Sequence, residues 1–177
     1  STLRIFNVLV IDADPVVGVA LERDLGPAHR IRTVGSAAEG LSEVDRRFPD
    51  VAVIGAGIPD TVGVGVLREL RRRHPDLPVI LVTGRDAVEV AVEAMRLGAY
   101  DVVPLPLRDE ALAPVLRNAL ESVRLRAEVN SLQARLLRDK IPAMVTESDA
   151  IRGVMELVSL VARSRSTPVL VLGGTGT

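Results

Sequence analysis

The sequence predicts an α/β fold with a doubly wound, five-stranded parallel sheet and a long helix after it. Short apolar runs alternate five times with amphipathic stretches along the first two thirds of the chain. Because the runs are apolar at consecutive positions, they are typical of parallel strands that are buried on both faces. Crossovers between such strands are right-handed, and the functional crevice of these sheets lies at the carboxyl ends of the strands.

The expected strands and helices follow from these runs and from the residues between them. Five apolar runs predict strands at residues 8–11, 31–34, 51–54, 79–82 and 101–103. Apolar residues at helical spacing predict helices over residues 16–25, 36–48, 62–73 and 87–97. Ser36 and Glu39 form a capping-box pattern, and Asp86 is expected to cap the fourth helix. The helices stop at residues that interrupt a helix, namely Gly26, Pro49, Pro75 and Gly98.

A fifth helix is expected to run from near Asp109 to Lys140, far beyond the sheet. About 30 residues of helix are roughly 45 Å long. Its second half carries apolar residues at heptad spacing: Leu125, Val129, Leu132 and Leu136. Such a stripe predicts a two-chain coiled coil, and therefore a homodimer. The alternative is a solvated linker helix that packs only on its own domain.

The residues after Lys140 begin a new pattern. A helix is expected over residues 149–163 and a strand over 168–172. The strand leads into a glycine-rich run, which is the start of a phosphate-binding loop without its lysine: Gly173, Gly174, Thr175, Gly176 and Thr177. We therefore predict three parts, with a first domain at 1–122, a linker helix at 123–140 and a fragment of a second domain at 141–177.

Composition excludes several classes of function. Lys and Arg number 22 against 23 Asp and Glu, so no excess of positive charge points to nucleic acid. The chain has no cysteine for a disulfide or a thiol nucleophile, and its two histidines, His29 and His74, are expected at the surface. No apolar run approaches the length of a membrane span, and no signal peptide is recognised. We expect a cytoplasmic protein.

The residues at the expected strand ends carry a resemblance. Asp12 and Asp14 follow the first strand, Thr83 ends the fourth, Tyr100 precedes the fifth, and the run from Pro49 to Asp60 lies across the third. Over about residues 5–122 this arrangement resembles the receiver domain of two-component response regulators, which has a flavodoxin-like fold. The long helix, residues 146–151 and the glycine-rich end are similar to the linker and ATPase start of NtrC-type, sigma-54-dependent activators.

The resemblance implies a set of functional positions, several of which are occupied by residues that cannot perform the chemistry. The phosphoacceptor position falls on Gly55, counted back from Pro59. The acidic pair falls on Asp12 and Ala13, and the lysine position falls on Leu105. The switch positions are expected to be Thr83 and Tyr100. Lys140, in the linker, is the only lysine of the chain.

These substitutions predict a regulatory module that works without phosphorylation and has no catalytic residue or bound metal, Mg²⁺ included. The resemblance implies that the module controls an ATPase domain of the same protein, and that ATP binds only to an intact parent. It also implies that sigma-54 RNA polymerase and DNA are reached through further domains.

Three other interpretations stay open at this point. Asp50 or Asp60 could be the acceptor if the register is different. Gly55-x-Gly57 could belong to a dinucleotide-binding turn, although Asp60 stands where a third glycine is needed. An ATPase that uses residues 173–177 would lack the lysine that contacts the phosphates.

Overall fold

A computed structural model describes residues 4–108, 111–140 and 149–161. The chain divides into two compact units, Ser1–Leu125 and Arg126–Thr177. The first unit holds a sheet with its covering helices, and the second holds the far part of the long helix and one further helix. Among the described residues, no helix is both long enough and apolar enough to cross a membrane.

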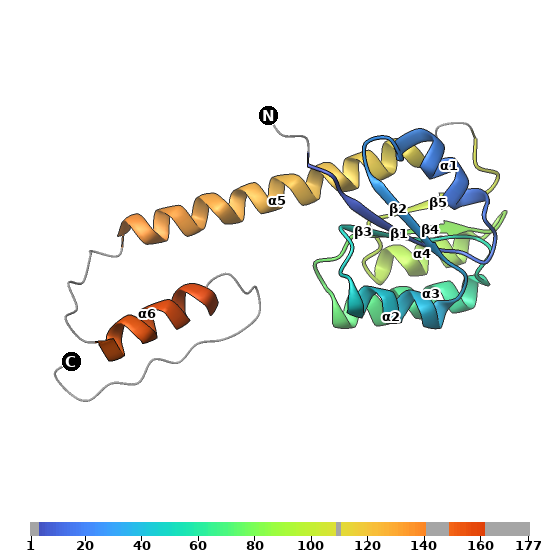
Figure 1. Ribbon diagram of the computed structural model, residues 1–177. Coiled ribbons are helices and arrows are strands. Elements are labelled where there is room, and N and C mark those ends of the chain that lie inside the picture. Colours follow the sequence, from blue (N-terminus) through green and yellow to red (C-terminus); the bar gives the residue numbers. More distant parts are fainter. Residues whose placement is uncertain (1–3, 109–110, 141–148, 162–177) are drawn as a thin grey trace. The chain divides into compact units, whose positions relative to one another are not determined.

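The first unit is built on a five-stranded parallel sheet, as the sequence predicts (Figure 1). Its strands are adjacent in the order β2-β1-β3-β4-β5, so the chain crosses over after β2 and continues in the other direction. All four strand pairs are parallel. The strands are β1 (Asn7–Ile11), β2 (Arg30–Val34), β3 (Val51–Ile54), β4 (Val79–Thr83) and β5 (Asp101–Pro104).

Helices cover both faces of the sheet, which confirms the predicted fold class. One face packs against α1 and the beginning of α5, and the other packs against α2, α3 and α4 (Figure 1). The helices are α1 (Val16–Leu25), α2 (Ala37–Arg46), α3 (Asp60–Arg73), α4 (Val88–Arg96), α5 (Leu112–Lys140) and α6 (Asp149–Val161). The predicted helix start near Asp109 and the predicted residues 162–163 lie outside the described residues.

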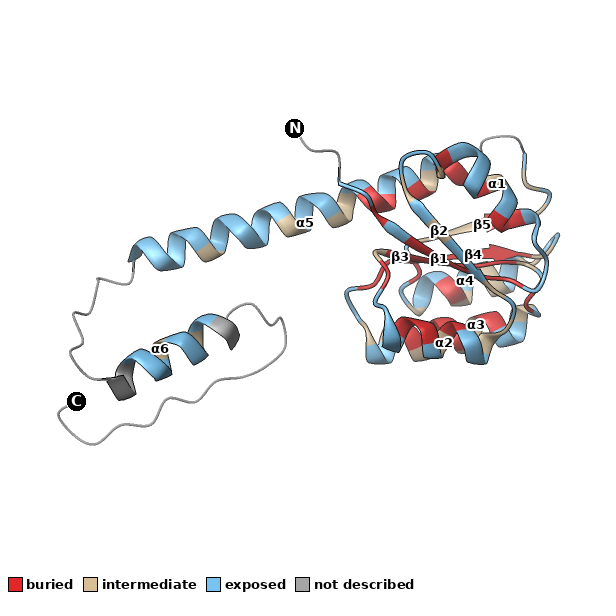
Figure 2. Ribbon diagram, in the orientation of Figure 1, coloured by how far each residue is buried: buried red, intermediate tan, exposed pale blue. Residues whose placement is uncertain are grey.

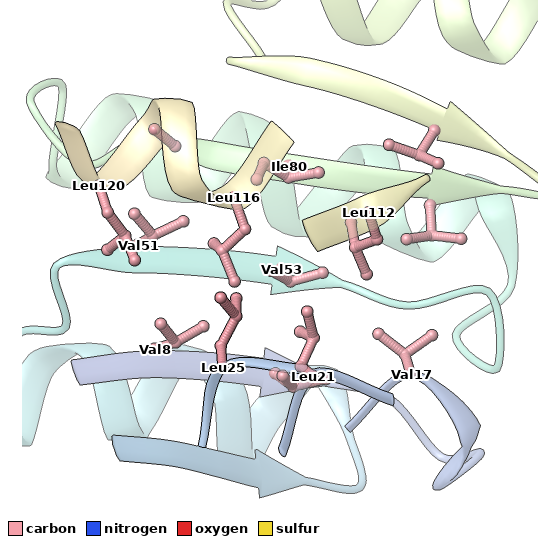
Figure 3. Packing of buried hydrophobic residues seen from close by; sticks show 14 of the residues in the cluster. Val8, Val17, Leu21, Leu25, Val51, Val53, Ile80, Leu112, Leu116 and Leu120 are labelled. Carbon is pink, nitrogen blue, oxygen red and sulfur yellow. The ribbon is translucent and has the colours of Figure 1, made fainter. Parts of the chain in front are cut away.

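The core on the α1 and α5 side shows why the strands are apolar at every position. Leu116 of α5 and Leu21 of α1 are almost completely buried and point toward Val53 of β3 (Figure 3). Alternate strand residues such as Ile54 point to the other face, into the cluster under α2, α3 and α4. Each fully buried Leu, Ile or Val contributes roughly 1.5–3 kcal/mol, so two apolar faces hold the sheet between its helices.

Several helix boundaries differ from the prediction by one or two residues, and two of the differences concern residues expected to end or cap a helix. The second helix was expected to reach Phe48, but α2 ends at Arg46, and Phe48 is 55% exposed. Pro49 explains the difference, because a proline disfavours helical geometry at the residue before it. Asp86 does not cap the fourth helix: it has a φ of 60°, and the N-cap is Ala87, which makes no side-chain hydrogen bond.

Other expected boundaries are present in the structure. Ser36 is the N-cap of α2, and its side chain accepts a hydrogen bond of 3.2 Å from the Glu39 N–H. Gly98 follows α4 with a φ of 92°, a conformation that glycine adopts without strain.

The long helix α5 changes character along its length. Its first turns are buried against the sheet, and the rest is mostly exposed within the chain (Figure 2). The heptad residues of its second half are between 47% and 59% exposed: Leu125, Val129, Leu132 and Leu136. The 29 residues of α5 confirm a helix about 44 Å long, but they do not show what covers this stripe.

Two helix glycines give a matched test of the packing. A Cβ at Gly40 of α2 would lie 2.7 Å from Ile11 Cγ1, whereas a Cβ at Gly65 of α3 would meet no atom within 4 Å. We expect Gly65→Ala to raise the free energy of unfolding by about 0.5–1 kcal/mol, since alanine favours helix. We expect Gly40→Ala to lower it by about 1–3 kcal/mol through overpacking. Urea denaturation of both variants measures this, and equal effects would contradict the packing.

Candidate functional site

The carboxyl ends of β1 and β3 meet at one edge of the sheet. Asp12 directly follows β1, and its backbone N–H donates to Val34 O at 2.9 Å. Gly55 directly follows β3, and its N–H donates to Ile11 O at 2.8 Å. The structure therefore places residue 55 beside Asp12, at the strand end where the family resemblance puts the phosphoacceptor.

The side chain of Asp12 links the two strand ends. It is only 3% exposed, and its Oδ1 atom accepts hydrogen bonds of 2.9 Å from the N–H groups of Asp14 and Gly57. The Oδ2 atom is buried and has no hydrogen-bond partner among the described residues. The carboxyl group thus fastens the loop after β1 to the loop after β3.

Gly55 and Gly57 leave the space that Asp12 occupies. A Cβ at residue 55 would overlap the Asp12 carboxyl group and would lie 2.6 Å from Asp12 Cβ. A Cβ at residue 57 would lie 2.6 Å from Asp14 N. This close approach explains the Gly-x-Gly pattern, for which the sequence also left open a dinucleotide-binding turn. The resemblance to receiver domains assigned no role to Gly57, although the Gly-x-Gly pattern of the sequence contains it.

Burial dominates the electrostatics of Asp12. Removal of the carboxyl group from water raises the pKa of Asp12 above its ordinary value. The N–H groups of Asp14 and Gly57 act in the opposite direction, and the negative charge of Asp14 raises the pKa slightly further. Because burial is the largest effect, the folded protein holds the proton of Asp12 more tightly than a water-exposed aspartate does.

The remaining receiver positions do not complete a metal or phosphoryl site. Ala13 is exposed and has no ligand atom in its side chain. Asp14 is exposed too, and its Oδ1 accepts the Val16 N–H at 3.0 Å. Leu105 packs against the core, while its N–H donates to Thr83 O at 3.0 Å.

A divalent cation does not fit these residues. Asp12 Oδ1 already accepts two hydrogen bonds, and Oδ2 lies where a side chain on residue 55 would begin. Mg²⁺ needs several oxygen ligands in octahedral order. Over the described part of the chain, no three His, Asp or Glu side chains are grouped so that they could hold a metal ion.

The structure does not bring the two expected switch residues together. Thr83 is buried at the last position of β4, whereas the Tyr100 N–H donates to the O atom of Val79, the first residue of β4. A strand of five residues spans roughly 13–17 Å, so Tyr100 lies near the opposite end of the sheet. The two expected switch residues therefore lie at different ends of β4, because the chain reaches Tyr100 before it enters β5. The four residues of β5, Asp101–Pro104, include no aromatic side chain.

The two other acceptor candidates lie at different ends of the strands. Asp50 precedes β3, where its carboxylate binds Arg4 at 3.1 Å and accepts the Asn7 N–H at 2.8 Å. Asp60 lies before the predicted helix over residues 62–73, but in the structure it is the first residue of α3. Its Oδ1 atom lies 3.3 Å from the donating N–H of Gly84, which directly follows β4. Asp60 therefore shares the edge with Asp12.

The predicted loop residues 173–177, like the predicted strand 168–172, lie outside the described residues.

The two histidines make contacts away from the sheet edge that holds Asp12. His29 Nδ1 accepts the Phe6 N–H at 3.4 Å, and His74 Nε2 lies 2.9 Å from Asp45 Oδ1. The neighbouring His74 and Arg73 lower the pKa of Asp45, with the hydrogen bond to His74 as the largest cause.

Known proteins share both the sequence and the fold. Residues 8–117 match the family described as response regulator receiver domain. The transcriptional regulator DctD of Pseudomonas aeruginosa, named for C4-dicarboxylate transport, is 36% identical over 173 residues, which are 96% of this chain and 37% of that protein. The DNA-binding transcriptional regulator NtrC of Escherichia coli is 32% identical over 96% of this chain and 36% of its own length. The chain thus spans about a third of the length of these relatives.

Solved structures agree with this result. The crystal structure of NtrX from Brucella abortus is 28% identical, with a TM-score of 0.66 over 89% of this chain and 35% of that one. A receiver domain protein from Clostridium thermocellum is 26% identical, with a TM-score of 0.61 over 68% of this chain and 98% of that one. The strand order, the residues at the sheet edge and these similarities lead to one conclusion: the chain belongs to the response regulator receiver family.

Proposed function

We propose that this receiver is a regulatory module that works without phosphorylation, within a sigma-54-dependent transcriptional activator. The observation that carries the proposal is the Asp12 carboxyl group, which is buried against Gly55 in the space of the missing acceptor side chain. In the intact protein the module would control an ATPase domain, and the output would be transcription through a DNA-binding domain. The similarity to DctD and NtrC over 96% of the chain supports this context.

The chemistry of phosphoryl transfer explains why we infer an inactive acceptor site. A carboxylate nucleophile must attack the phosphorus atom, and cations must neutralise the charge on the transferring oxygens. Gly55 has no nucleophile, and Leu105 has no positive charge to offer. Asp12 remains, but it is buried, its Oδ1 accepts two N–H donors, and its pKa is raised by burial. Its geometry suits a structural link between loops better than a metal ligand.

Asp60 is the alternative acceptor that one specific observation favours. Its carboxylate lies at the same sheet edge, next to the Gly84 N–H. The first turn of a helix stabilises a carboxylate, which lowers its reactivity as a nucleophile. No lysine is present in the first 139 residues to balance a phosphoryl group there.

Acetyl phosphate with Mg²⁺ tests the acceptor directly. We expect the intact mass of the protein to stay unchanged, because Gly55 offers no acceptor and Leu105 offers no countercharge for the transferring group. We expect Gly55→Asp to stay unmodified as well, and to lose about 1–3 kcal/mol of unfolding free energy, since its Cβ overlaps Asp12.

Mass spectrometry of four proteins separates the outcomes: the parent chain, Gly55→Asp, Asp50→Ala and Asp60→Ala. A gain of one phosphoryl mass in the parent, lost in Asp60→Ala or Asp50→Ala, would show that the receiver has a displaced acceptor. A phosphorylated and stable Gly55→Asp would disprove the steric argument.

The pH dependence of stability tests the burial of Asp12. Because burial raises the pKa of Asp12, the folded state holds its proton more tightly than the unfolded state does. Its contribution to stability is therefore complete below the ordinary value of 3.8 and is lost as the pH rises through the folded pKa. We expect Asp12→Asn to unfold at a higher urea concentration than the parent at pH 7, with a difference that shrinks toward pH 4.

Asp12→Ala is the matched control for that experiment. Alanine removes the acceptor of the Asp14 and Gly57 N–H groups, so this variant should lose about 1–3 kcal/mol. An asparagine variant that is less stable than the parent at pH 7 would mean that the charged carboxylate is favoured in the folded protein.

We also infer that the long helix pairs two copies of the chain. Its heptad residues, about half exposed within one chain, form an apolar stripe of four side chains: Leu125, Val129, Leu132 and Leu136. Covering each side chain contributes roughly 1.5–3 kcal/mol, and eight of them per pair can offset the cost of association. A receiver without an acceptor would hold this dimer independently of phosphorylation.

Sedimentation at micromolar concentration tests the pairing. Val129→Asp together with Leu132→Asp should convert a dimer into a monomer, because charges in the stripe repel one another, while the circular dichroism of the sheet domain is kept. Asn130→Asp with Ser131→Asp adds the same charge outside the stripe and should leave the dimer intact. A monomeric parent, or a dimeric double variant, would show that the helix is only a linker.

A further inference from the structure

A cavity of about 520 Å³ lies near the amino-terminal ends of β1 and β2, where they face the end of α2. Arg30 and Arg32 of β2 line one side, and Glu43, Arg47 and Phe48 line the other. The cavity lies away from Asp12, since its β1 residues begin at Asn7, the first residue of that strand, and Asp12 follows the last one. The receiver chemistry uses none of these side chains.

The charges around this cavity are not balanced. Glu43 is 5% exposed, and its carboxylate lies 3.1 Å from Arg32 Nε and 3.7 Å from Arg46. Within the described residues, no ion pair neutralises Arg30 or Arg47. Like charges around one hollow repel each other, so an anion placed between them is favoured.

Two further features point to a ligand larger than a simple ion. Phe48 lines the cavity and is 55% exposed. The centroids of the Phe48 and His74 rings are 5.2 Å apart. Such a ring offers an apolar surface to a planar group. The buried Glu43 Oε1 atom has no hydrogen-bond partner, because its contact with Arg32 lacks hydrogen-bond alignment. A ligand N–H or O–H group would satisfy it.

We propose that this cavity binds a phosphate monoester joined to a planar, hydrogen-bond-donating group, with the size of a mononucleotide. The planar guanidinium groups of Arg30 and Arg47 match the oxygen geometry of a phosphate. Phe48 covers the planar group, and Glu43 accepts its hydrogen bond. A volume of about 520 Å³ is typical of small-molecule sites. The inference goes beyond the proposed function, because it adds a small-molecule input at a separate place.

A small ligand suits the charge distribution better than a polyanion does. Nucleic acid is held by extended basic surfaces that neutralise many phosphates. Here two arginines without an ion pair among the described residues, Arg30 and Arg47, line one hollow, and the chain as a whole has a net charge of −1. A single dianionic group is therefore the matching partner.

NMR titration of the ¹⁵N-labelled 177-residue chain at low salt tests the proposal with three probes: adenosine monophosphate, adenosine and inorganic phosphate. We expect saturable shifts with the monophosphate at a Kd below about 1 mM, centred on Arg30, Arg47 and Phe48. Adenosine and inorganic phosphate should bind at least about tenfold more weakly, because each offers only part of the recognised chemistry. Absent shifts, or inorganic phosphate binding as tightly as the nucleotide, would overturn the proposal.

Variants locate the binding. Arg30→Gln with Arg47→Gln should weaken monophosphate binding at least about tenfold. Arg68→Gln with Arg96→Gln removes the same charge from α3 and α4 and should have little effect. Phe48→Leu keeps every charge and should weaken the monophosphate while leaving inorganic phosphate unchanged.

Equal binding by the parent and the Arg30/Arg47 variant would place the ligand elsewhere and disprove the site. Phosphorylation at the Asp12 edge is measured by mass, whereas ligand binding is measured by NMR. Failure of the ligand-binding proposal would therefore leave the proposed function unaffected.

Discussion

The parallel pairing of β1 with β3 is the constraint on which the candidate site depends. Ile11 pairs with Ile54, so the residues that follow them, Asp12 and Gly55, emerge side by side. The two backbones approach so closely that a Cβ at residue 55 would lie 2.6 Å from Asp12 Cβ. A buried carboxyl group then needs donors, and the N–H groups of Asp14 and Gly57 supply them. Packing and hydrogen bonding at this edge therefore support one another.

The same arrangement changes what the edge can do. In a phosphate-accepting receiver the carboxylates must stay charged and open to a metal ion, whereas burial here raises the pKa of Asp12 and its Oδ1 atom already accepts two N–H groups. The carboxyl group has become a link between two loops. Asp60 makes a second link, to the Gly84 N–H after β4, so three neighbouring strand ends are joined by hydrogen bonds. A rigid edge of this kind suits a domain that presents one fixed surface.

Two features that the receiver chemistry does not use lie away from this edge. Arg30 and Arg47, which form no ion pair among the described residues, line a cavity near the first residues of β1 and β2. The apolar heptad stripe lies on the part of α5 that continues beyond the buried turns. A doubly wound sheet has two ends and a terminal helix, and each can change without disturbing the buried core between them. The loss of phosphorylation chemistry that we propose at one end is thus compatible with the ligand binding that we propose at the other.

The sequence alone determined the fold class, because five apolar runs that alternate with amphipathic helical stretches are typical of a parallel sheet with helices on both faces. With the family resemblance it also located Gly55 and Leu105, and it showed that no lysine precedes Lys140, because these points depend on residue identity and position along the chain. Only the tertiary structure placed Asp12 in the space of the missing side chain, separated Thr83 from Tyr100, and gathered Arg30 and Arg47 around one cavity. These relations join residues that are distant along the chain, and strand register and helix ends decide them.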